Sequence, residues 1–61
     1  MEHLLNVKEL AEKLHLSLAE IYLLTERGEI PHYKIGRVLR FSPNVIENWL
    51  TKQQKMSEPQ K

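Results

Sequence analysis

The apolar residues near the start of the chain repeat with the spacing of an α-helix. They recur at positions i, i+3, i+4 and i+7, which predicts one apolar helix face. The residues of this face are Val7, Leu10, Ala11 and Leu14. Asn6 lies directly before them and Glu9 three residues later, a pattern typical of a capping box at a helix start. The sequence therefore predicts a first helix that begins after Asn6.

A second helix is predicted from residue 17 to about Arg27. Its first four residues, Ser-Leu-Ala-Glu, form a Ser-x-x-Glu capping box. Gly28 follows the predicted end and suits the left-handed conformation just past a helix, because glycine has no Cβ. His15 and Leu16 lie in the short turn between the two helices. Two short helices joined by about three residues are typical of a helix-turn-helix.

Residues 30–41 alternate in the manner of β-strands and predict a hairpin around Gly36. Two registers are open. A three-residue loop would pair Ile35 with Leu39, whereas a two-residue turn would put Val38 inside and Leu39 outside. Burial favours the three-residue loop, because a slip of one residue turns every side chain over. The expected buried face then holds Tyr33, Ile35, Leu39 and Phe41, and the expected exposed face holds Lys34, Val38 and Arg40.

A third helix is predicted to begin at Ser42-Pro43, with Ser at the N-cap and Pro at the first helical position. Its apolar stripe consists of Val45, Ile46, Trp49 and Leu50. From position 51 onward there is almost nothing to bury, so we expect a domain over residues 1–50 and a polar, disordered tail over residues 51–61. The predicted fold is mainly α with a small β-hairpin, in the order α-α-β-β-α: a winged helix-turn-helix.

The formal net charge of +1 hides an uneven distribution along the chain. Residues 1–30 hold three Lys or Arg and six Glu, a net charge of −3. Residues 31–41 hold three cations and no acid, a net charge of +3, and residues 42–61 have a net charge of +1. Attraction for phosphate is therefore expected at the hairpin.

Composition excludes several classes of function. At 61 residues the chain forms one small domain, and without cysteine it has neither disulfides nor thiolate metal ligands. The three histidines lack ligand spacing, and Ser17 and Ser42 are explained as caps, so no catalytic set is evident. We expect no enzyme, metal, cofactor or small-molecule ligand. No apolar run approaches the roughly 20 residues of a membrane span, and no signal peptide is evident, so we expect a cytoplasmic protein.

A series of short motifs runs through residues 4–50 with nearly gapless spacing. They are Leu-Leu-Asn-Val-Lys-Glu-Leu-Ala-Glu-Lys-Leu, Leu-Ser, Ile-Tyr, Gly-Glu-Ile-Pro, Tyr-Lys-Ile-Gly-Arg, Arg-Phe-Ser and Trp-Leu. This series resembles the excisionase-type DNA-binding domain of the MerR-like winged-helix group. The resemblance implies a recombination directionality factor or small transcriptional regulator that binds and bends repeated sites on double-stranded DNA. Adjacent copies of the chain, and an integrase, are the other implied partners.

In that family the second helix enters the major groove and the wing reaches the adjacent minor groove. Here relatives usually place Arg, Ser, Thr or another Arg at the positions of Leu18, Ala19, Glu20 and Leu23. Bases are typically read by Arg, Lys, Asn or Gln, and the predicted helix face has none of these. Of the residues on this face, only Tyr22 matches the pattern of the family. The N-termini of the first two helices are further candidates for phosphate contacts. The candidate DNA-binding residues are Ser17, Leu18, Ala19, Tyr22, Leu23, Arg27, Lys34, Arg37 and Arg40.

The hairpin cations have two interpretations. They form either a solvated strand face or contacts to phosphate and the minor groove, and three cations without an acid favour the contacts. Arg37 at the predicted tip is the best candidate for insertion into a narrow minor groove. Arg40 could instead brace the hairpin against the second helix by pairing with Glu20 or Glu26.

The large apolar side chains of the second helix have three interpretations. Leu18, Tyr22 and Leu23 could cover the core, touch thymine methyl groups, or form a surface for a protein partner. The last interpretation supports an alternative function, in which the fold serves as a protein-interaction module that has lost base-specific recognition.

Overall fold

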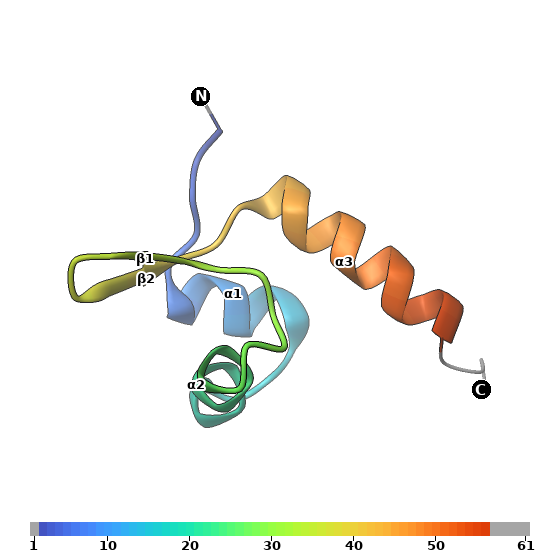
Figure 1. Cartoon of the computed structure of the whole chain (residues 1–61), viewed down its shortest axis with the longest axis horizontal. Helices are drawn as coiled ribbons and strands as arrows, with labels where there is room; N and C mark the ends of the chain where they lie inside the picture. The colour runs from blue at the N-terminus through green and yellow to red at the C-terminus, as the bar shows by residue number, and fades with distance from the viewer. Residues whose placement is uncertain (1, 57–61) are drawn as a thin grey trace.

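The computed structural model describes residues 2–56 of the chain, and the side chains of residues 2–53. It confirms the predicted order of three helices and one antiparallel hairpin (Figure 1). The elements are α1 (Val7–Leu14), α2 (Leu18–Glu26), β1 (Tyr33–Ile35), β2 (Val38–Arg40) and α3 (Pro43–Met56). The fold is a winged helix-turn-helix.

Both predicted capping boxes are formed. The Asn6 side chain accepts a hydrogen bond of 2.8 Å from the Glu9 backbone N–H, and the Glu9 carboxylate accepts one of 2.9 Å from the Asn6 N–H. Ser17 and Glu20 repeat the arrangement at the start of α2, at 3.1 and 3.0 Å. Gly28 follows α2 with a φ of +70°, as the glycine at that position predicts. These caps satisfy backbone donors that a helix start otherwise leaves unpaired.

A small core joins the elements. Its buried members are Leu10, Ala11, Ile21, Ile30, Phe41 and Ile46, and the largest of them are completely enclosed. Each buried leucine, isoleucine or phenylalanine side chain stabilises the fold by about 1.5–3 kcal/mol. The N-terminal arm is tied to the same core, because Leu5 and Phe41 exchange two backbone hydrogen bonds of 2.8 and 2.9 Å. The predicted apolar face of the first helix is confirmed, because all four of its residues lie in this core or pack against it.

The hairpin register differs from the three-residue loop that the sequence favoured. Ile35 pairs with Val38 across a two-residue turn, so Leu39 lies opposite Lys34. Gly36 has a φ of +64°, which favours a type II′ turn, in which glycine takes the first central position. The tight turn matches the twist of the strands, and its geometry outweighs the burial that a longer loop was expected to provide.

The buried face of the hairpin was therefore predicted only in part. Leu39 and Phe41 do pack on the core, but Tyr33 and Ile35 are 48% and 56% exposed. The prediction was wrong for them because the hairpin projects beyond the core (Figure 1), so burial does not act on its outer residues. Lys34 also changes sides and lies on the face opposite Val38 and Arg40, rather than with them.

The third helix begins as predicted, and the Ser42 hydroxyl accepts a hydrogen bond of 3.2 Å from the Val45 N–H. The same hydroxyl donates to the Glu2 carboxylate, which draws the N-terminal arm to the start of α3. The helix does not stop near Leu50, however. It continues to Met56, so residues 51–56 of the predicted tail are helical, and residues 57–61 lie outside the described part of the chain. In Figure 1 this half of α3 extends away from the hairpin.

Candidate nucleic-acid interface

The outer surface of α2 is exposed and mostly apolar. Ile21 and Thr25 face the core, which turns Ala19, Leu23 and Glu26 outward on the opposite side of the helix. Tyr22 lies on the flank of this surface, with 52% of its side chain exposed. A helix surface of this kind is free to contact another macromolecule.

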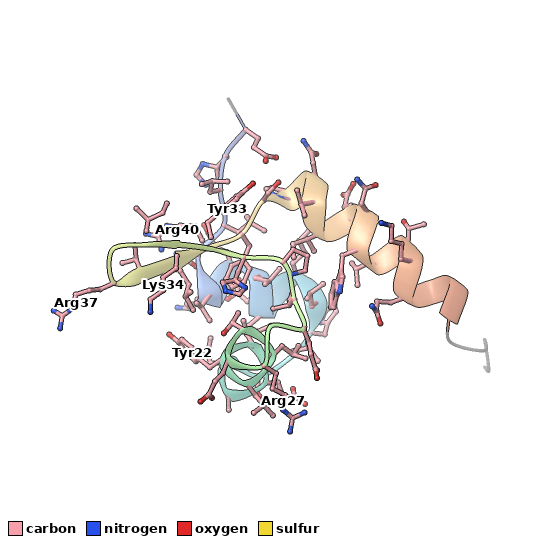
Figure 2. All side chains as sticks on the ribbon, in the orientation of Figure 1. Tyr22, Arg27, Tyr33, Lys34, Arg37 and Arg40 are labelled. Carbon is pink, nitrogen blue, oxygen red and sulfur yellow. The ribbon has the colours of Figure 1, made fainter. Side chains whose placement is uncertain are left out.

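The hairpin holds its cations beside α2 and beyond it. Lys34 pairs with Leu39 across the hairpin, so the two side chains share the face that packs on the core through Leu39. In Figure 2 the Lys34 side chain extends toward α2 and Tyr22. Arg37 is at the tip of the turn, where its guanidinium extends away from the molecule (Figure 2). The turn predicted to present Arg37 is therefore present, with a different register.

Two hollows that share part of their lining lie beside the hairpin, one toward the start of α1 and the other toward α2. We call them together the α2–hairpin groove. Tyr22, Arg37 and Leu39 line both hollows. The first hollow is completed by Asn6, Val7, Lys8, Val38 and Arg40. The second is completed by Thr25, Glu26, His32 and Lys34. The groove thus joins the start of α1, one flank of α2 and both strands.

The electrostatics of the α2–hairpin groove are strongly one-sided. Among its lining residues four are cations, and Glu26 is the single acid. The four cations are Lys8, Lys34, Arg37 and Arg40. None of them forms an ion pair with any of the described side chains, so their charges are not neutralised within the fold. An exposed cationic groove of this kind attracts a polyanion.

The brace considered for Arg40 is not formed. Its guanidinium donates a hydrogen bond of 2.8 Å to the carbonyl of Leu39 instead of pairing with an acid of α2. The Glu20 carboxylate is occupied by the backbone N–H and hydroxyl of Ser17. Arg40 is partly buried and lines the first hollow, so it remains available to an anion there.

Two other cations differ from expectation. Arg27 caps the end of α2 and in Figure 2 lies below that helix, on the side away from the hairpin, so the structure does not bring it into the groove. Lys8 lies in the first turn of α1 and lines the groove, although it is not among the candidate residues drawn from the sequence. The backbone N–H groups of Val7 and Lys8 add partial positive charge, because the first turn of a helix leaves them without an intrahelical partner. No local signal marks Lys8, since its role depends on where the hairpin folds.

The remaining candidates lie along α2 outside the groove. Ser17 caps the helix, and Leu18 borders a separate hollow between α1 and α2. Leu18 and Leu23 are 47% and 44% exposed, so covering the core is not their main role. The structure therefore unites Tyr22, Lys34, Arg37 and Arg40 in one groove and sets Ala19 and Leu23 on the adjacent outward surface.

Within residues 2–56 no helix is both long and apolar enough to cross a membrane. The same residues contain no group of three or more His, Asp or Glu side chains that could hold a metal ion.

The three helices, the tight turn between the first two and the cationic hairpin define a winged helix-turn-helix protein. The chain belongs to the helix-turn-helix domain family, whose sequence model matches residues 4–54. This family binds DNA and is typically non-enzymatic, which makes the chain a small DNA-binding protein. No curated protein and no solved structure matched the chain.

Proposed function

We propose that this protein is a DNA-binding protein of the excisionase type. In this proposal α2 lies in the major groove of double-stranded DNA and the hairpin reaches the adjacent minor groove. The observation that supports it is the α2–hairpin groove, which is lined by four cations without an ion pair and by a single acid, Glu26. A helix fits a B-DNA major groove, which is about 12 Å wide.

Contacts to the sugar-phosphate backbone of the DNA supply most of the affinity in this proposal. Lys34 and Arg37 approach phosphates or the minor groove from the hairpin, and Lys8 and Arg40 do so beside the N-terminus of α1. Four neutralised phosphates give a slope of log K against log salt of about −3.6. Between 50 and 200 mM salt the affinity then falls by roughly 150-fold.

The proposed role is that of a recombination directionality factor or a transcriptional regulator at repeated sites. A single domain with few contacts binds weakly, and neighbouring copies on the same DNA raise the effective affinity. An integrase bound nearby is the further partner proposed. Tyr22 and the apolar side chains around it contribute limited base or thymine-methyl contact.

Fluorescence anisotropy on a repeat-containing duplex at two salt concentrations tests the proposal. Arg37→Ala should weaken binding by about 1–3 kcal/mol if the side chain enters a groove of the DNA. Arg27→Ala is the matched control, because it removes the same charge from the side of α2 away from the hairpin. No binding by the unaltered protein at low salt, or equal losses in the two variants, would contradict the proposed interface.

A second function is favoured by one observation, the exposure of Leu18 and Leu23 on a helix without strong base-reading residues. In this case α2 binds a protein partner or a second copy. Leu23→Asp should then abolish association in sedimentation experiments while Arg37→Ala has little effect. The reverse pattern, with Arg37→Ala damaging and Leu23→Asp neutral for association, rejects this function.

A further inference from the structure

Glu26 is the unexpected residue of the α2–hairpin groove. Its side chain lines the second hollow together with Lys34 and Arg37, yet it pairs with neither cation. It is exposed in the last turn of α2, where a negative charge interacts unfavourably with the helix dipole. The carboxylate therefore stabilises neither the helix nor the groove. Contact with a bound ligand is the role that its position allows.

The outward surface of α2 contains few groups that can form hydrogen bonds. Ala19, Leu23 and Glu26 occupy successive turns on this surface, and the first two are apolar. Tyr22 on the flank offers one hydroxyl. If α2 enters the major groove, Glu26 is the charged hydrogen-bonding group that this surface presents to the base edges.

An ionised carboxylate only accepts hydrogen bonds, and this restricts the bases it can recognise. In the major groove guanine presents two acceptors, and adenine presents its amine beside the N7 acceptor, which repels a carboxylate. Cytosine presents an N4 amine without an acceptor of its own next to it, and Glu and Asp characteristically accept from that amine.

We propose that Glu26 determines sequence specificity by accepting a hydrogen bond from the N4 amine of a cytosine in the major groove. This proposal rests on the proposed function, since it requires α2 to lie in that groove. At a site without the cytosine, the carboxylate faces base acceptors, or an adenine amine with the N7 acceptor beside it, and it lies near phosphates of like charge. Glu26 therefore favours one base and also disfavours the others, which is how specificity is built from repulsion as well as attraction.

Selection from a duplex library with randomised positions, followed by sequencing and anisotropy on the selected sites, tests this role. The unaltered protein should prefer cytosine at one position by roughly 5- to 150-fold, the equivalent of about 1–3 kcal/mol. Glu26→Ala should lose that preference and bind unselected duplex more tightly at low salt. Glu26→Gln should shift the preference toward adenine, whose N6 and N7 a glutamine side chain contacts together.

Glu29→Gln is the matched control, because it makes the same charge change at an exposed residue outside the groove lining. It should leave the selected sequence unchanged. An unchanged preference in Glu26→Ala, or an equal change in Glu29→Gln, would overturn the role of Glu26 while leaving DNA binding intact. Failure of the unaltered protein to bind any duplex at low salt would instead overturn the proposed function itself.

Discussion

Replacing Lys8 with glutamine should make the fold more stable and its DNA binding weaker. Lys8 is in the first turn of α1, where a cation faces the positive end of the helix dipole. Removing that charge should raise the free energy of unfolding by about 0.3–1 kcal/mol at low salt. For a domain of this size the melting temperature rises by a few degrees, at about 4–8 °C per kcal/mol.

The same substitution removes one of the four cations of the α2–hairpin groove. The slope of log K against log salt should then change from about −3.6 to about −2.7. Between 50 and 200 mM salt the loss of affinity should shrink from roughly 150-fold to roughly 40-fold. The effect should be nearly the same on every duplex sequence, because a phosphate contact does not distinguish bases.

Lys13→Gln is the control, because it should change the free energy of unfolding in the direction opposite to Lys8→Gln. Lys13 is in the last turn of the same helix, where its charge complements the dipole, and it is absent from the groove lining. This variant should melt at a slightly lower temperature and keep the full salt dependence. Thermal melting by circular dichroism and anisotropy at several salt concentrations measure both quantities. An unchanged salt slope in Lys8→Gln would refute the assignment of Lys8 to the interface.

Three further substitutions examine the fold that presents the groove. Phe41→Ala should lower the free energy of unfolding in urea by about 3–5 kcal/mol, because the ring is completely buried, and a cost below about 1 kcal/mol would contradict that packing. Ser17→Ala should cost about 1 kcal/mol through loss of the α2 cap, and an unchanged urea midpoint would contradict it. Gly36→Ala should lower the free energy of unfolding by about 1–2 kcal/mol, because an L-residue is strained at this positive φ. An added Cβ meets no other atom there, so no steric clash contributes to this cost. D-Alanine at this position should restore stability, and equal costs for both isomers would refute the turn.

Local sequence signals predicted the helices well because their causes are local. The capping boxes at Asn6 and Ser17 involve residues three apart, and the glycine at position 28 follows from its own backbone conformation. The apolar stripe of α1 required only one packed face. The end of α3 was placed too early, because the absence of apolar residues after position 50 does not prevent a helix of good helix formers from continuing.

The groove was harder to predict because it depends on contacts between distant residues. Arg37 could be placed from its position in the turn, whereas Lys8 lines the groove only because β2 folds back beside the start of α1. Arg27 resembled the other cations in sequence but lies beyond the far side of α2. Burial could not decide the hairpin register, since the outer face of the strands is exposed whichever residues occupy it.

The observed register makes the hairpin a charged wall of the groove. With Ile35 opposite Val38, the face that contains Leu39 also contains Lys34, so the packing of one apolar side chain on the core turns an ammonium group toward α2. The predicted register would have set Lys34 on the outer face, away from Tyr22 and Glu26. The two-residue turn therefore determines both the sign of the charge beside α2 and the surroundings of Glu26, the single acid that lines the groove. Any change that lengthens the turn should disrupt both together.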